Sequence, residues 1–208
     1  MMFLQILFTL SFLFSSSNAL DFCVADLNAP QGPVGYSCKK AEAVTVEDFV
    51  FSGLRAAGNT SNLKKSVLRP AASNQLPGVN GLGISAVRLD FAVGGRTAMH
   101  THPEATEVVV VIQGTLVGGF ISSANKVYLK SLKEGDVMVF PQGLMHFQIN
   151  IGESQALAFG CLSSASPSVY FMDYAWFAND LPTHILQETT FLDPDQIKKL
   201  KGVLGGTG

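Results

Sequence analysis

The feature that most constrains the fold is a series of about nine short apolar runs between residues 84 and 173, each bounded by Gly, Pro, Asn or Ser. The runs are Ile84–Ala92, Thr97–His102, Glu107–Gln113, Thr115–Ser122, Lys126–Ser131, Asp136–Phe140, Met145–Asn150, Ala156–Leu162 and Val169–Asp173. Strand-like runs at this spacing are typical of antiparallel sandwiches and barrels. We therefore predict one all-β domain, because no break in the pattern divides it into two.

The C-terminal tail has a different pattern. Asp193 and Pro194 form the N-cap and first-turn pair of a helix, in which Ile197, Leu200 and Leu204 recur at helical spacing. A second short helix is expected at Thr183–Glu188, so that helices occupy residues 183–204. Such a pair either caps its own barrel or docks on a neighbouring subunit.

The N-terminal segment indicates secretion. Met1–Ala19 has no charged side chain, its apolar part is too short to span a bilayer, and Ser17 and Ala19 are small residues where a signal peptidase reads. We interpret it as a signal peptide cleaved after Ala19, in preference to a membrane anchor. Residues 20–208 then form a single extracellular domain without a membrane span. Up to about Ser73 this domain reads as irregular, with extended pieces at 44–51 and 66–69.

The cysteines fit an oxidising compartment. Cys23 and Cys38 flank a turn-rich stretch near the mature N-terminus and are expected to pair. Cys161 lies in an apolar run and is expected to be a buried free thiol. Asn59 begins the sequon Asn-Thr-Ser, a candidate glycosylation site.

The charge balance argues against one class of partner. The chain has 14 Lys and Arg against 16 Asp and Glu, a formal net charge of −2. Proteins that bind nucleic acid normally carry a basic excess, so we expect no nucleic-acid partner.

Three of the four histidines indicate a metal site. His100 and His102 are two residues apart and point to the same face of a strand. Glu107 is an odd number of residues further, but Pro103 interrupts the strand, so a new strand from Glu107 resets the parity and brings its carboxylate to the same interior. His146 opens a later strand. Three imidazoles and one carboxylate make a divalent-metal site with open positions, although spacing alone would accept zinc, iron, nickel or copper.

Two other titratable residues are expected outside this set. Glu104 follows Pro103 and is expected to be solvated, and His184 is expected to lie on the surface of the tail.

The strand 108–112 has no polar residue and is expected to be buried on both faces.

These residues resemble a known family. The first cupin motif matches at Gly94, His100, His102, Glu107 and Gly114, and the second at Gly135, Pro141, Gly143, His146 and Asn150. Other stretches resemble plant germins and germin-like proteins, among them residues 21–26, 35–38, 57–61 and 143–148. The ending 198–207 resembles the subgroup described as auxin-binding germin-like proteins.

The resemblance implies a cupin β-jellyroll barrel with C-terminal helices, assembled as a hexamer that is a trimer of dimers. It implies one manganese per chain, bound by His100, His102, Glu107 and His146, with Asn150 as a candidate outer-shell group. It also implies a Cys23–Cys38 disulfide and residence in the plant apoplast.

Germins proper are oxalate oxidases that hold their substrate with two asparagines, and this sequence departs from them. Val87 and Thr97 stand at the matching positions, and valine cannot hydrogen-bond oxalate. The family's basic-Gly-acidic tripeptide is replaced by Gln113-Gly114-Thr115. We therefore expect no oxalate oxidase activity.

Two functions remain open, besides a structural or storage role in the cell wall. The first is manganese superoxide dismutase, which needs an open metal position and little substrate pocket. The second is a binding or receptor-like protein for auxin, whose carboxylate the metal would hold. Met99, Phe140, Met145 and Phe147 would suit an aromatic ring, or equally an ordinary barrel core.

Overall fold

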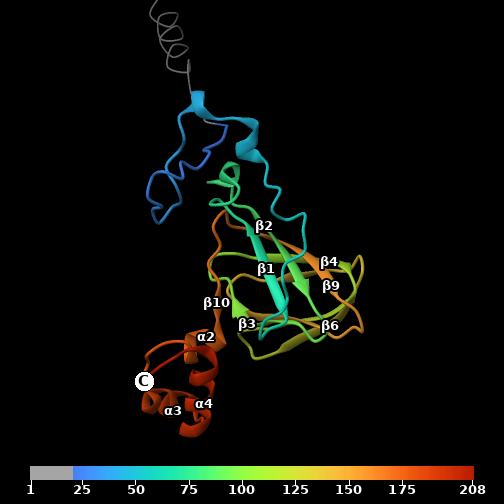
Figure 1. Ribbon diagram of the computed structural model, residues 1–208, viewed down its shortest axis with the longest axis vertical. Coiled ribbons are helices and arrows are strands. Elements are labelled where there is room, and N and C mark those ends of the chain that lie inside the picture. The colour runs from blue at the N-terminus through green and yellow to red at the C-terminus, as the bar shows by residue number, and fades with distance from the viewer. Residues whose placement is uncertain (1–20) are drawn as a thin grey trace, which may run out of the picture.

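The computed structural model describes residues 21–208, which form a barrel of two facing antiparallel sheets with an N-terminal segment at one end and a helical arm at the other (Figure 1). One sheet has the strand order β1 (Ser66–Ala71), β2 (Ser85–Phe91), β9 (Ala156–Leu162), β4 (Glu107–Gln113) and β7 (Val137–Phe140). The other has the order β10 (Tyr170–Phe171), β3 (Arg96–Thr101), β8 (Met145–Asn150), β5 (Thr115–Ile121) and β6 (Val127–Lys133). The all-β jellyroll prediction is confirmed.

Alternation along the strands builds the core between the sheets. In β8 every second residue is buried, and in β9 Ala156, Ala158, Gly160 and Leu162 face inward. Ala156, Ala158 and Leu162 of β9 pack with residues such as Leu89, Phe91, Val109 and Leu116 in one apolar cluster. The buried residues of β8 are polar: His146, Gln148 and Asn150. Left-handed glycines make the tight connections that such short strands need, as at Gly114 between β4 and β5, where φ is +83°.

The outer face of β4 contradicts the expectation of a strand buried on both sides. Val109 and Val111 are buried, but Val108 and Ile112 on the other face are 37% and 42% exposed. No described segment of the same chain covers this face. The apolar run therefore has one buried and one exposed face, as in an ordinary antiparallel sheet.

Cys161 also departs from expectation. It lies on β9 directly opposite Val108 of β4, at an outward position, and is an exposed free thiol. An apolar neighbourhood in sequence suggested burial, but the strand's two-residue period places Cys161 between inward-facing Gly160 and Leu162.

Two segments predicted as extended are partly helical. Within 44–51 the chain forms a 3-10 helix, η2 (Val46–Phe49), because Thr45 and Asp48 form a capping box at its start. Shorter 3-10 helices, η1 (Ala41–Ala43) and η3 (Pro77–Val79), lie on either side in the chain. In the run 169–173 only two residues pair, with Thr101 and His100 of β3, before the chain leaves the sheet as α2 (Met172–Phe177).

The N-terminal segment contains the expected Cys23–Cys38 disulfide. Buried Asn80 ties this loop to the domain, since its amide donates to the carbonyls of Cys23 and Tyr36 and its oxygen accepts from the Tyr36 N–H. The expected signal peptide lies outside the described residues, and no described helix is long and apolar enough to cross a membrane.

The predicted C-terminal helices are confirmed as α3 (Thr183–Thr190) and α4 (Pro194–Leu204). The Asp193 side chain accepts from the Asp195 N–H at the start of α4, and left-handed Gly205 ends it. The helices pack mainly on one another, around Phe177, Leu186 and Ile197. They extend from the barrel as an arm (Figure 1).

Candidate metal centre

The four predicted ligands come together inside the barrel. His100 on β3 lies opposite His146 on β8, His102 follows the end of β3, and Glu107 begins β4 on the facing sheet. Their ligand atoms all lie within 4.8 Å of one another, and all four residues are buried. The bend after Pro103 resets the strand parity as predicted, so both sheets contribute to one site.

Each imidazole is oriented by its other ring nitrogen. The Nδ1 atoms of His100, His102 and His146 lie 2.8, 2.7 and 2.8 Å from backbone carbonyl oxygens, those of Ala98, Ser168 and Leu144. A carbonyl only accepts, so each Nδ1 carries the proton and donates. The three Nε2 atoms therefore face the centre, the arrangement that a metal requires of its histidine ligands.

The charges of the four side chains suit the centre to a cation. Burial, reinforced by the neighbouring His146, lowers the pKa of His100 to about 3, so this ring is neutral at physiological pH. The only anion in the set is Glu107, whose Oε2 lies 3.2 Å from His146 Nε2 and 4.0 Å from His102 Nε2. A buried carboxylate flanked by imidazoles fits a divalent ion, which supplies the positive charge that the residues lack.

Small and aromatic neighbours fix the ligands in place. The Phe140 ring stacks on His146 with centroids 4.8 Å apart. On β9, Gly160 leaves room for the carboxylate, because a Cβ at this position would lie 2.6 Å from Glu107 Oε1. Any larger residue there would displace the Glu107 carboxylate.

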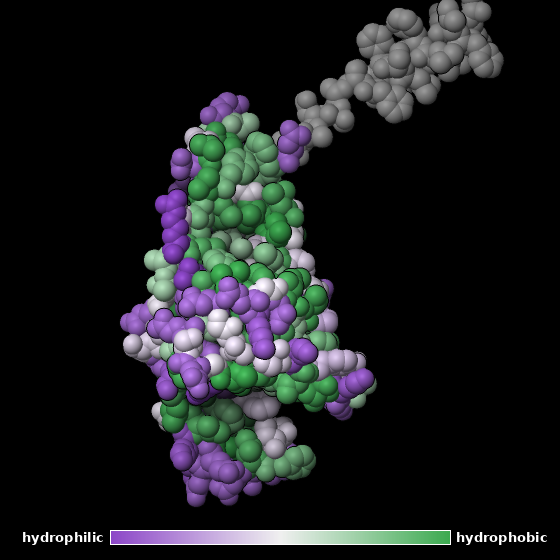
Figure 2. Space-filling view, turned by 90° about the vertical axis from the view of Figure 1, so that its right-hand side faces the viewer, coloured by the Kyte–Doolittle hydropathy of each residue, from purple (hydrophilic) through white to green (hydrophobic). Residues whose placement is uncertain are grey.

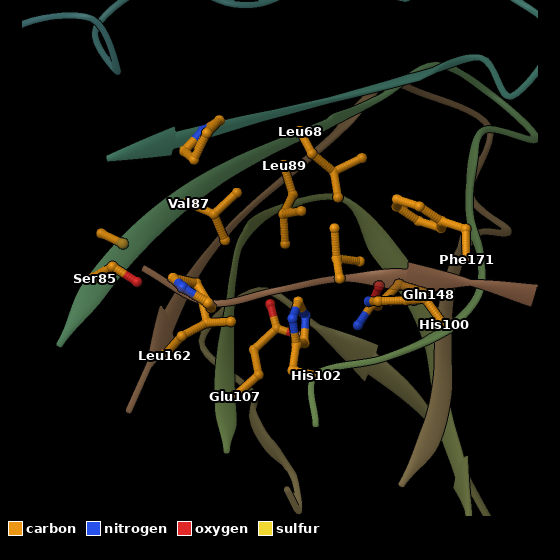
Figure 3. A pocket seen from close by; sticks show the side chains of 14 residues that line it. Leu68, Ser85, Val87, Leu89, His100, His102, Glu107, Gln148, Leu162 and Phe171 are labelled. Atoms are coloured by element: carbon orange, nitrogen blue, oxygen red, sulfur yellow. The ribbon is translucent and has the colours of Figure 1, made fainter. Parts of the chain in front are cut away.

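A cavity of about 310 Å³ opens directly onto His100, His102 and Glu107. Figure 3 shows Leu68, Val87 and Leu89 on the side facing Glu107 and His102, with Phe171 at one end. The apolar lining is completed by Pro70, Ala86, Leu162, Pro167 and Val169. The apolar residues considered from sequence, Met99, Phe140, Met145 and Phe147, are not among the lining residues, because β1, β2 and the segment 167–171 supply the wall instead.

Gln148 is a polar residue of this cavity that the sequence analysis did not single out. It is 1% exposed, lines the cavity, and neither its Nε2 nor its Oε1 has a hydrogen-bond partner among the described residues. Such an amide is costly unless a ligand or water satisfies it. The signal was available, since Gln148 is two residues from His146 on β8 and must share its face.

Three other predicted residues have different outcomes. The Asn150 amide donates to the carbonyls of Ala92 and Ser154 and its oxygen accepts from the Gly152 N–H, so among the described residues it pins the end of β8 and supports no ligand directly. His184 is exposed, as expected. Glu104 is exposed too, but its carboxylate accepts from the Ser168 N–H and is not simply solvated.

Comparison with known proteins agrees with this geometry. Residues 52–198 match the cupin family model. The chain is 62% identical to auxin-binding protein ABP20 of Prunus persica, across 99% of this chain and 97% of that protein. It is 56% identical to germin-like protein subfamily 3 member 3 of Arabidopsis thaliana, across 99% of each chain. The chain belongs to the germin-like branch of the cupin family.

A solved germin structure shares the fold. Recombinant oxalate oxidase in complex with glycolate superposes with a TM-score of 0.85 at 35% identity, covering 89% of this chain and 96% of that one. In this germin-like chain, Val87 lines the cavity beside the ligands, and Thr97 is buried with an unpartnered hydroxyl among the described residues. The wall is therefore apolar where the resemblance expected an asparagine.

Proposed function

We propose that this germin-like chain binds one manganese ion through His100, His102, Glu107 and His146. The observation that carries the proposal is the convergence of four buried ligand atoms within 4.8 Å, with each Nδ1 already engaged by a carbonyl. Nitrogen and oxygen donors without a thiolate suit manganese, and the resemblance to germins favours it over other divalent ions.

The test is metal content. His102→Ala should remove most of the bound manganese, whereas His184→Ala, which changes an exposed histidine of the arm, should retain one ion per chain. Full occupancy of His102→Ala by elemental analysis would contradict the assignment.

We propose superoxide dismutation as the activity of a secreted, apoplastic protein, with a role in cell-wall or defence redox chemistry. Bound manganese supplies a one-electron redox couple. The protein's part is to keep three neutral imidazoles and one carboxylate in place, to leave a position open toward the cavity, and to admit a small anion. The loss of substrate asparagines does not matter for an anion of that size.

The measurement is superoxide consumption per bound manganese, with free manganese at the same concentration as the control, because the free ion dismutates superoxide by itself. Activity no higher than that of the free ion would remove the enzyme proposal.

Oxalate oxidase activity is not part of the proposal, since Val87 offers oxalate no hydrogen bond. Hydrogen peroxide production from oxalate by the manganese-loaded protein would contradict this.

A second candidate function, the binding of a ligand such as auxin, is supported by the cavity itself. Its walls are mostly apolar, and it combines the metal ligands with the unpartnered amide of Gln148. A ligand with a carboxylate at the metal and an aromatic body against Leu68, Leu89 and Phe171 would fit this chemistry, and relatives are named auxin-binding proteins. Calorimetry with indole-3-acetate should then show binding that Leu89→Ala weakens and that metal removal abolishes. Binding unchanged without metal would exclude this mode.

We further propose that the chain assembles as a hexamer, a trimer of dimers. Apolar side chains are exposed on the outer face of β4 and β7, among them Val108, Val137 and Val139, and on the arm, where Trp176 is 44% and Phe191 94% exposed. Figure 2 shows further hydrophobic surface over the upper part of the molecule, toward the N-terminal segment, and again at the lower end, where the arm lies. A second copy would cover such surface. Light scattering measures the mass, and a monomer at micromolar concentration would contradict the proposal.

We also propose that Asn59 is glycosylated, as fits a secreted protein. Its side chain is exposed in a loop, where the Asn59 oxygen accepts from the Ser61 N–H. Treatment of the plant-expressed protein with an amidase that releases N-glycans should lower its mass, and Asn59→Gln should not respond.

A further inference from the structure

We infer that Glu104 is a positioning residue for the metal centre, which it serves by holding the backbone of Ser168 in place beside the His102 ring. The inference deepens the proposed metal-binding function and rests on it. It concerns the residue that the sequence placed in solvent, two positions after His102.

The three ligand imidazoles are not oriented in the same way. His100 and His146 donate to carbonyls two residues earlier in the chain, so local strand geometry alone provides their partners. His102 donates instead to the carbonyl of Ser168, 66 residues away. The orientation of His102 therefore depends on a tertiary contact that β3 does not supply.

The partner of His102 lies in a stretch without regular structure. Residues 163–169 connect β9 to β10 and contain no helix or strand. The other hydrogen bonds that tie this stretch to the rest of the chain lie before Ser168. Ser163 bonds with Thr106, the Ala165 carbonyl accepts from the Ser73 N–H, and the Ser166 hydroxyl accepts from the Gln31 amide. Ser168 lies at the far end and needs a tie of its own.

Glu104 supplies that tie. Its carboxylate accepts from the Ser168 N–H, while the carbonyl of the same residue accepts from His102 Nδ1. Residues two positions apart on the β3–β4 bend thus hold Ser168 through its N–H and its carbonyl. An anionic acceptor makes the stronger kind of hydrogen bond.

The position of Ser168 affects Nε2 of His102, the atom that would bind the metal. With the Ser168 carbonyl in place, the His102 proton stays on Nδ1 and the Nε2 lone pair faces the centre. Without it, the ring is free to rotate and to exchange tautomers. The neighbours Pro167 and Val169 line the metal cavity, so the same contact also places part of its wall.

The experiment compares Glu104→Ala and Glu104→Gln with Glu134→Ala, which removes an exposed carboxylate from the turn between β6 and β7. The first readout is the nitrogen NMR of the histidine rings in metal-free protein. Glu104→Ala should give mixed tautomers at His102 alone, Glu104→Gln should largely keep the Nδ1–H form because it retains an acceptor oxygen, and the control should match the wild type. A His102 that stays fully in the Nδ1–H form in Glu104→Ala would overturn the inference.

The second readout is manganese affinity by calorimetry. Glu104→Ala should weaken binding about tenfold, the low end of the effect of outer-shell partners, with a smaller loss in Glu104→Gln and none in the control. Affinity within twofold of wild type in Glu104→Ala would contradict the inference. If the wild type binds no manganese, the proposed function fails, but the tautomer measurement in metal-free protein still decides the role of Glu104.

Discussion

The imidazoles of His100 and His146 face each other across β3 and β8, with ring centroids 4.1 Å apart. Two such rings stay this close without repulsion only if at least one of them is neutral. Burial ensures this for His100, and both rings then present lone pairs to the same point. The pair forms half of the candidate metal site, which Glu107 and His102 complete.

Glu107→Gln should preserve the volume of the site and remove its only anionic ligand. Manganese affinity should fall by more than the about 10- to 100-fold typical of outer-shell changes, because a direct ligand and its charge are lost. Dismutase activity per bound ion should also fall, since the carboxylate helps to set the potential of the metal. Calorimetry and superoxide consumption measure the two effects separately, and an unchanged affinity would show that Glu107 is not a ligand.

Gly160→Ala should disturb the centre from β9. The new Cβ would lie 2.6 Å from Glu107 Oε1 and 2.8 Å from Val87 Cγ1, so the carboxylate must move. We expect weaker manganese binding and a loss of about 1–3 kcal/mol in the free energy of unfolding from overpacking. Gly202→Ala in α4 is the matched control, because nothing lies within 4 Å of its Cβ position. Equal behaviour of the two variants would contradict the prediction.

The metal-free protein should lose stability as the pH falls from about 6.5 toward 3. Burial lowers the pKa of His100 in the folded state to about 3, so in this window the unfolded chain binds a proton that the folded chain does not. The contribution is complete above pH 6.5, is lost progressively on acidification, and is on the order of 5 kcal/mol in full. Denaturant unfolding at several pH values measures it, and His100→Leu should show a flatter profile. An equal pH dependence in that variant would assign the effect elsewhere.

Lys201→Met should loosen the helical arm. The buried ammonium of Lys201 donates to the carbonyls of Asn179 at 3.1 Å, Leu181 at 2.8 Å and Thr207. Removing it leaves these acceptors without that donor, at a cost of about 1–3 kcal/mol. Hydrogen exchange should rise in α2 and α4, whereas Lys199→Met at an exposed position should leave it unchanged. Unchanged exchange in Lys201→Met would show that the tail is held by other contacts.

One thiol per chain should react with a thiol reagent when the assembly is dissociated, and peptide mapping should identify it as Cys161. Cys23 and Cys38 are joined, while Cys161 is exposed on the outer face of β9, opposite Val108. If a second copy covers this face, the reaction should be slower in the intact assembly. Reaction at equal rates in both states would place the interface elsewhere, and a disulfide to Cys161 would contradict the pairing.

Local pattern was enough to predict most strands, both C-terminal helices and the four residues of the candidate metal site. Side chains two residues apart lie on the same face of any strand, which places His100 and His102 together. Pro103 predicts the break in the strand that lets Glu107 face the same interior. The same rule would have found Gln148, two residues after His146. Capping residues located the start of α4 at Asp193 because capping is decided within a few positions of the chain.

Tertiary structure alone decided which faces are covered and what surrounds the ligands. Val108 and Cys161 lie in runs as apolar as any core strand, yet they are on the outer face of a sheet that no described part of the chain covers. The cavity wall comes from β1, β2 and residues 167–171, and Glu104 meets Ser168 from 64 positions away. Side-chain alternation depends on neighbours in sequence, but coverage and hydrogen-bond partners depend on which distant segments the fold brings together, and that information is absent from any single stretch of the chain.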